Sequence, residues 1–346
     1  MQVSVRRTVL VLAILFFAGS PAGLNAQGVA SERITVDVVV DAKGSKPPAT
    51  VAGLQQQDFT VLDNKVPRTL TSFRAVSAGQ EPVRVVLLVD AVNIRLQGLA
   101  YERDQMGGFL RAHDGKLAHP TAIAILTDKG LQMQGGFSTD GNAMADNLQK
   151  QNIGMRTITR NTGFYGAEDR LRISIDGLRT LTEHEAAQPG RTVILWVSPG
   201  WPLLTGPGIE LSRQDEMRLF GDIVNLSTQL REARVTLYAI DPIGADEGLG
   251  RVNDYQQFLK GVAKFSQAEA GNLSLQVLAV QSGGLAINSN GTTALLQQCV
   301  ADLDNYYKIS FDAPPAETPD TYHHLEIKVN KPGMVARTRD GYYAEP

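Results

Sequence analysis

Asp90 places a carboxylate, a group that could bind a ligand or react, directly after an apolar stretch of this chain. It follows Val83 to Val89 (VRVVLLV), where five consecutive apolar residues predict a strand buried on both faces, as in a parallel sheet. Such a strand carries Asp90 to the carboxyl edge of the sheet, where open α/β sheets bind ligands. The carboxylate could hold a cation there, cap the next helix or contact a partner.

Asn93 and Arg95 follow Asp90 closely enough to decide between these roles. Asn93 could supply a second oxygen to a cation, although its position also suits the N-cap of the helix that follows. Arg95 could neutralise the carboxylate in an ion pair. A cap or an ion pair would give Asp90 a structural role in place of a ligand.

Ser198 is a candidate nucleophile, in the segment Trp196-Val197-Ser198-Pro199-Gly200 between a predicted strand and a helix. This is the setting of the Gly-x-Ser-x-Gly nucleophile elbow of hydrolases, but Trp196 replaces the first glycine. Pro199 follows the serine, and because proline has no N–H it cannot donate to an oxyanion. We therefore do not expect a serine hydrolase at Ser198.

Trp201 lies in the apolar loop Gly200 to Leu204, which should reach the same sheet edge as Asp90. A tryptophan beside leucines and prolines could anchor a protein interface. The alternative is that Trp201 packs back onto its own domain. A third motif, His184 to Gln188 (HEAAQ), begins like the zinc-protease His-Glu-x-x-His, but Gln188 replaces the second histidine and predicts the polar end of a helix.

Residues 1–26 have the pattern of a secretory signal peptide. Arg6 and Arg7 precede an apolar stretch, and small residues around Ala26 resemble a cleavage site. We therefore expect a secreted or periplasmic protein. No later stretch is long and apolar enough to span a bilayer.

Cys299 is the only cysteine, so no internal disulfide can form. Its helical spacing with Leu295, Leu296 and Leu303 predicts a buried, inert thiol. A net charge of -3 and a pI near 6.0 argue against a broad nucleic-acid surface.

Alternating apolar residues at both ends of the mature chain predict strands with one solvent-facing side. These strands are Ile34 to Val40, Phe59 to Val61, Tyr307 to Phe311 and Leu325 to Val329. Neither end has enough strands for a sandwich of its own, so we predict one small antiparallel β-sandwich-like domain made of residues 27–80 and 306–346. Residues 81–305 would then be an inserted domain.

The inserted segment alternates predicted strands and helices. Buried strands at Val193 to Val197 and Val235 to Ile240 join the strand before Asp90, and a hairpin at Asp128-Lys129-Gly130 adds an antiparallel edge strand. Helices are predicted between the strands, including a long helical region from Asn253 to Gln281, interrupted near Gly271. This order predicts an α/β fold with a doubly wound, mostly parallel sheet.

This layout is similar to the von Willebrand factor A domain, and the chain resembles a secreted, acidobacterial-type family related to that domain. The resemblance covers most of the mature chain. It is carried by VDVVVDAKG and LQQQDFTVLDNKVPRTLTSFR before the domain, by VRVVLLVD and VTLYAID as strands, and by the closing RDGYY. It implies a binding or adhesion module.

In A domains that bind metal, the resemblance implies an Asp-x-Ser-x-Ser motif, a threonine on a later loop and an aspartate after the fourth strand. Such oxygen ligands suit Mg²⁺. Asp90 matches the first acid and Thr162 the threonine, which makes them candidate metal ligands. Val92 and Ile94 stand where the serines would be, and Pro199 replaces the last acid. We expect a degenerate metal-ion-dependent adhesion site with no obligatory cofactor, Mg²⁺ being the one possible ion.

The sequence favours a non-enzymatic protein-binding module that uses the Asp90 edge, because no catalytic set is complete. Two alternatives stay open: a hydrolase or other enzyme with an unrecognised site at the same edge, and a structural factor in an envelope assembly. The candidate contact residues for a protein partner are Asp90, Asn93, Arg95, Thr162, Ser198 and Trp201.

Overall fold

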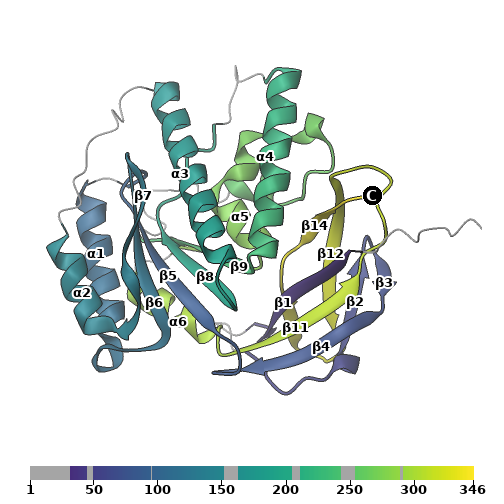
Figure 1. The fold of residues 1–346 in the computed structure, drawn as a ribbon, viewed down its shortest axis with the longest axis horizontal. Coiled ribbons are helices and arrows are strands. Elements are labelled where there is room, and N and C mark those ends of the chain that lie inside the picture. Colours follow the sequence, from purple (N-terminus) through teal and green to yellow (C-terminus); the bar gives the residue numbers. More distant parts are fainter. Residues whose placement is uncertain are drawn as a thin grey trace, which may run out of the picture. The chain divides into compact units, whose positions relative to one another are not determined.

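Three β-sheets organise the part of the chain that a computed structural model describes (Figure 1). The described residues are 32–44, 50–94, 96–151, 163–204, 211–242, 254–288 and 291–346. One sheet has six strands in the order β10-β9-β8-β5-β6-β7, and two sheets have four strands each, β13-β1-β11-β4 and β14-β12-β2-β3. The prediction of an α/β fold with a mostly parallel sheet and additional antiparallel strands is confirmed.

The six-stranded sheet is parallel except at one edge. Its parallel strands are β5 (Val83–Asp90), β6 (Lys116–Thr127), β8 (Arg191–Val197), β9 (Val235–Asp241) and β10 (Ala286–Asn288). The last strand, β7 (Gly130–Asp140), pairs antiparallel with β6, as the hairpin signal predicts. Because β5 is covered on both faces, Leu87 packs into one core and Leu88 into the other.

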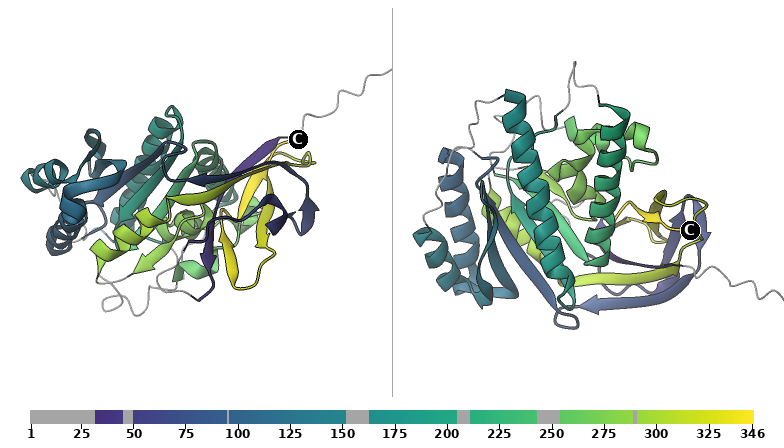
Figure 2. Two further views of the ribbon diagram at one scale, coloured as in Figure 1. Left: turned by 90° about the horizontal axis from the view of Figure 1, so that it is seen from below. Right: turned by 45° about the horizontal axis from the view of Figure 1, so that its top comes forward.

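Helices cover both faces of this sheet. On the Leu87 face lie α1 (Leu96–Arg111), α2 (Gly141–Lys150) and α6 (Thr292–Ala301). On the Leu88 face lie α3 (Gly163–Ala186), α4 (Arg213–Glu232) and α5 (Leu275–Gln281). Figures 1 and 2 show α3 and α4 side by side, and the two helices are in contact. The sheet is therefore covered as in a doubly wound fold.

The long helical region predicted from Asn253 to Gln281 is wrong for most of its length. Three short 3-10 turns, η4 (Asp254–Phe258), η5 (Phe265–Gln267) and η6 (Ala270–Leu273), precede α5. The Asn272 side chain explains part of this result, because its Oδ1 accepts from the backbone N–H of Glu269 and its amide donates to the Phe258 carbonyl. Such side-chain bonds to the backbone compete with a continuous helix.

Strands from both ends of the chain build the two four-stranded sheets. In one sheet β1 (Arg33–Ala42) pairs with β11 (Asn305–Asp312) and β13 (Met334–Arg337), and β11 also pairs with β4 (Leu70–Ser77). In the other, β12 (Thr321–Val329) pairs with β2 (Phe59–Asp63) and β14 (Gly341–Ala344), and β2 also pairs with β3 (Val66–Arg68). One apolar core includes residues of both sheets, which makes the pair a β-sandwich.

The predicted burial of Cys299 is confirmed. Cys299 is 1% exposed, and burial raises the pKa of its thiol above the ordinary value. His323 and His324 point to opposite faces of β12: His323 is buried against Asp63, and His324 is exposed. Among the described residues, no helix is both long and apolar enough to cross a membrane.

Candidate functional site

The Asp90 carboxylate ends β5 fully buried, with 0% of the residue exposed. Its Oδ1 accepts hydrogen bonds from the backbone N–H groups of Val92 and Asn93, both at 3.0 Å. Its Oδ2 accepts from the Asn93 side-chain amide at 2.9 Å and from the Trp196 indole at 3.0 Å. Four protein donors therefore satisfy the carboxylate, which organises the turn after β5 and does not face solvent.

Asn93 ties this turn to helix α3. Its Nδ2 donates both to Asp90 and to Ser174 Oγ, the latter at 2.8 Å, and the Ser174 hydroxyl donates to the Arg170 carbonyl. Asn93 Oδ1 is buried and accepts no hydrogen bond. The predicted N-cap at Asn93 is therefore wrong. Asp90 and Ser174 bind the Asn93 side-chain nitrogen, and Oδ1 accepts no hydrogen bond from the backbone N–H groups of the helix.

The residues around Asp90 do not fit the Mg²⁺ site that the family resemblance implies. Val92 and Ile94, at the two serine positions, are 3% and 1% exposed and pack into opposite cores. The Asp90 oxygens face N–H donors, whereas Mg²⁺ needs several oxygens directed at it. The described residues contain no group of three or more His, Cys, Asp or Glu that could hold a metal ion. The candidates Thr162 and Arg95 lie outside the described residues.

Ser198 follows β8 and is 1% exposed, so its hydroxyl is not presented to a substrate. Its Oγ accepts a hydrogen bond from the Gly200 N–H at 3.2 Å, and its own N–H donates to the Ile240 carbonyl. Gly200 has φ 104°, which favours glycine, and an added Cβ would overlap the Gln276 side chain. Ser198 therefore stabilises a tight turn that only glycine can complete.

Trp201 packs inward, so the prediction of an exposed interface anchor is wrong and the alternative, packing onto its own domain, holds. It is 4% exposed, and its ring meets that of Trp196 nearly edge-on at 5.0 Å between centroids. Both rings belong to the core under α3, α4 and α5. The large apolar area of an indole favours this burial, even though Trp201 Nε1 is left without a hydrogen-bond partner.

Glu102 is an acid at this edge that the sequence analysis did not single out. It lies on α1 at 0% exposure, and neither carboxyl oxygen has a hydrogen-bond partner. Burial raises the pKa of Glu102 well above the ordinary 4.5, and the negative charges of Asp90 and Asp241 raise it further. Its helical spacing with the buried Leu99 and Met106 was a signal that could have found it.

The starts of three helices surround the carboxyl edge of the sheet. Helix α1 follows β5, and α4 leads back to the amino end of β9, so both begin at this edge. Helix α3 passes the edge at Ser174, which Asn93 contacts. Because a helix rises about 1.5 Å per residue, the residues of α3 before Ser174 extend beyond the sheet.

Exposed apolar side chains occur on or directly beside these three helices. Among the described residues, six large hydrophobic side chains are exposed, and four of them lie here. They are Tyr101 (39% exposed), Tyr165 (76%), Leu211 (38%) and Met217 (47%). We call these four residues the rim. The other two, Val66 and Val335, belong to the β-sandwich.

Comparison with known proteins identifies no family. No protein-family model matches the chain, and no curated protein sequence matches it.

Several solved structures are similar to parts of the chain at low identity. Proximal thread matrix protein 1 from the mussel byssus matches with a TM-score of 0.33 and 12% identity over 66% of this chain and 49% of that chain. Manganese-loaded TRAP protein from Plasmodium vivax matches with a TM-score of 0.33 and 11% identity, over 80% of this chain and 98% of that chain. The three N-terminal domains of the type V pili tip protein Mfa5 from Porphyromonas gingivalis match with a TM-score of 0.33 and 10% identity, over 91% of this chain and 67% of that chain.

This chain thus spans about half the length of the byssus protein chain. Similarities at TM-scores of 0.33 assign neither a family nor a function to this chain.

Proposed function

We propose that this chain is a non-enzymatic protein-binding module of the von Willebrand factor A type, whose rim contacts a protein partner. The observation that carries the proposal is that four of the six large hydrophobic side chains exposed among the described residues lie on or directly beside α1, α3 and α4. Tyrosine and methionine are enriched in protein interfaces. The partner is therefore a protein with an apolar contact surface.

In this proposal, residues 81–305 form the A-type domain and are inserted in the β-sandwich of residues 27–80 and 306–346. The parallel centre, the antiparallel edge strand β7 and the helices on both faces support the A-type assignment. Residues 1–26 direct export, so that the module binds its partner in the periplasm or outside the cell.

The buried polar groups position the rim and make no contact with the partner. Asp90 fixes the turn before α1, and through Asn93 and Ser174 it joins that turn to α3. Tyr101 lies on α1 and Tyr165 on α3, the two helices that these contacts join. No cation is required, because four N–H groups already donate hydrogen bonds to the Asp90 oxygens.

A capture experiment with matched variants tests the proposal. The mature protein is cross-linked to envelope and extracellular proteins, the retained partner is identified, and its Kd is measured for each variant. Met217→Ser removes an exposed side chain from the rim, and Val335→Ser removes one of equal exposure, 47%, from the β-sandwich. Tyr165→Ala probes the most exposed member of the rim.

We expect Tyr165→Ala to weaken binding about tenfold, which corresponds to roughly 1.4 kcal/mol. Met217→Ser should weaken binding by a smaller factor, and Val335→Ser should leave the Kd unchanged. Equal Kd values for rim and sandwich variants would refute the rim as the contact surface. Failure to retain any protein would count against a binding module altogether.

A further inference from the structure

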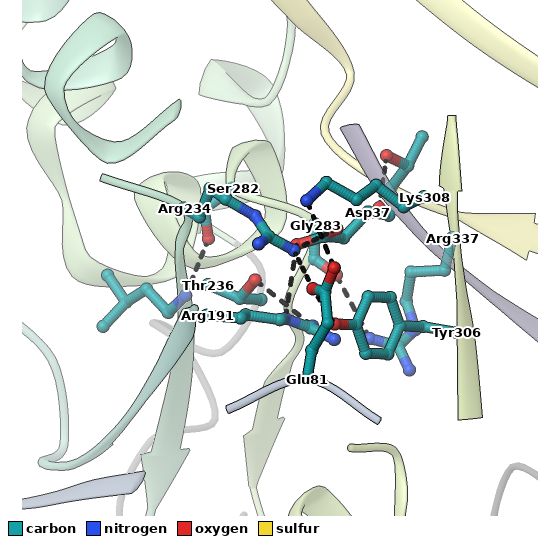
Figure 3. Close-up of polar contacts among 12 residues, drawn as sticks. Asp37, Glu81, Arg191, Arg234, Thr236, Ser282, Gly283, Tyr306, Lys308 and Arg337 are labelled. Carbon is teal, nitrogen blue, oxygen red and sulfur yellow. Dashed lines mark hydrogen bonds and ion pairs between the residues drawn. The ribbon is translucent and has the colours of Figure 1, made fainter. Parts of the chain in front are cut away.

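The β-sandwich is attached at the amino-terminal edge of the six-stranded sheet through largely buried ion pairs (Figure 3). Arg234, directly before β9, donates to both oxygens of Asp37 on β1, at 2.9 and 3.1 Å. Glu81, before β5, accepts a hydrogen bond from Lys308 on β11 at 3.3 Å. The protein's own sandwich thus occupies this edge, and a strand of another molecule could join the sheet only beside its two outer strands, β10 and β7.

Strand β7 lacks most of the features that usually shield an outer strand. Among the described strands it pairs with β6 alone, so its outer side presents backbone N–H and C=O groups that no strand satisfies. Proteins commonly protect such a side by keeping the strand short or by placing charges and prolines on it. Strand β10 has only three residues, whereas β7 has eleven and carries no charge and no proline from Gly130 to Thr139.

Two adjacent glycines lie in the middle of β7. Gly135 has φ 70°, which favours glycine, and it lies in the register irregularity between Gln134 and Ser138. Gly136 has no left-handed φ, and an added Cβ would meet no atom within 4 Å, so its own chain gives no reason for a glycine there. A glycine weakens a strand and often marks the close approach of another backbone. Gly136 therefore indicates a contact with a strand from outside the chain.

The side chains of β7 are self-complementary about Gly135. When a second copy of β7 runs antiparallel to the first with Gly135 on the two-fold axis, residues equally far from Gly135 lie opposite each other. Met133 then meets Phe137, and both are partly buried apolar side chains on the sheet face that α3 covers. A thioether beside an aromatic ring is a favourable contact. Gln132 meets Ser138 on the other face, and the two-fold axis repeats both pairs.

The charges at the two ends of β7 are also complementary. Lys129 is exposed in the turn before the strand, and Asp140 is exposed at its end. The same pairing places Gly130 of one copy opposite Asp140 of the other, so that Lys129 lies beside Asp140 of the second copy. Opposite charges across a strand pair stabilise it. We propose that two copies of this chain dimerise by antiparallel pairing of their β7 strands, which joins the two six-stranded sheets into one continuous sheet.

Sedimentation velocity of the mature protein at increasing concentration tests this proposal. Gly136→Lys adds a charged side chain to the outer strand, and because its Cβ has open space the fold should persist, which an unchanged Tm verifies. Gly221→Lys on α4 is the matched control, since an added Cβ there also meets no atom within 4 Å. We expect wild type and Gly221→Lys to dimerise, and Gly136→Lys to raise the dimer Kd at least about tenfold. Lys129→Glu should raise it by a smaller factor, because glutamate would face Asp140.

Engineered cysteines test the register. Gln132→Cys/Ser138→Cys should form a covalent dimer on oxidation, because opposite residues of paired strands bring their Cβ atoms within about 5.5 Å. Gln132→Cys/Thr139→Cys, with its two thiols on opposite faces, should not, and the buried Cys299 does not compete. Wild type that stays monomeric at every concentration would overturn the proposal. So would a dimer that persists unchanged in Gly136→Lys, or equal cross-linking of the two cysteine pairs.

Discussion

Replacing Glu102 by glutamine should stabilise the protein, and by an amount that grows with pH. The Glu102 carboxyl is fully buried on α1 without a hydrogen-bond partner, and burial, Asp90 and Asp241 raise its pKa well above 4.5. The folded protein therefore keeps a proton that the unfolded chain releases above about pH 4.5. Since the native state binds more protons, its stability falls as pH rises through this range.

The magnitude follows from the linkage between protons and folding. Each pH unit over which only the folded state keeps the Glu102 proton lowers the free energy of unfolding by about 1.4 kcal/mol. The loss stops growing once pH passes the folded pKa. Glutamine has the same shape and no titrating proton, and its unpartnered amide carries a desolvation penalty similar to that of the neutral acid.

Urea denaturation from pH 4.5 to pH 8 measures this effect. The two proteins should be nearly equal in stability at pH 4.5, and Glu102→Gln should gain about 1.4 kcal/mol on wild type for each pH unit above it until the curve levels. Glu168→Gln, an exposed glutamate on α3, is the control for removing a surface charge, with an expected change within about 0.5 kcal/mol.

A stability difference between Glu102→Gln and wild type that stays constant with pH would refute this reasoning. It would mean that the folded protein holds Glu102 ionised, with a compensating partner.

Three further predictions concern other parts of the molecule. Arg337→Met should destabilise the protein by about 3–5 kcal/mol in urea denaturation, because it leaves the 2%-exposed Asp302, now paired at 2.6 Å, without its cation. Burial raises the pKa of Asp63, but hydrogen bonds from His323 and Tyr342 outweigh it and hold this pKa below 3.8. The ionised Asp63 therefore stabilises the fold above pH 3.8, and this stabilisation is lost as pH falls through the folded pKa. Asp63→Asn should abolish that acid-dependent loss of stability. Millimolar Mg²⁺ should leave the Tm of the wild-type protein unchanged. A clear rise in Tm would instead indicate that a metal ion binds at Asp90.

The strands and helices of the fold were largely predictable, because residues that are buried in a strand or helix recur at regular spacing in the sequence. The continuous apolar run before Asp90 predicted β5, and the alternation near Ile34 predicted β1. The prediction of a long helix around Asn272 was wrong, because the Asn272 side chain bonds to the backbone there and apolar spacing does not reveal such bonds.

The candidate site was less predictable because its contacts join distant parts of the chain. The Trp196 indole donates to Asp90 across 106 residues, and Asn93 reaches Ser174 across 81. No local pattern indicates that these donors saturate the carboxylate. The position of Trp201 depended on the same contacts, since its ring packs on the tryptophan that donates to Asp90.

The pairing of β1 with β11 has a consequence for how the chain folds. Arg33 and Asp312 meet across 279 residues, and closing so long a flexible loop costs about 5 kcal/mol of entropy. Once the six-stranded sheet has folded, it holds both ends of the intervening segment together, as the 3.3 Å ion pair between Glu81 and Lys308 shows. We therefore expect the sandwich to form last, after the ribosome has released β11 and β12. A chain that stops before Asn305 would lack both partners of β1 and would leave β2 paired with β3 alone, so that the open strand edges could aggregate.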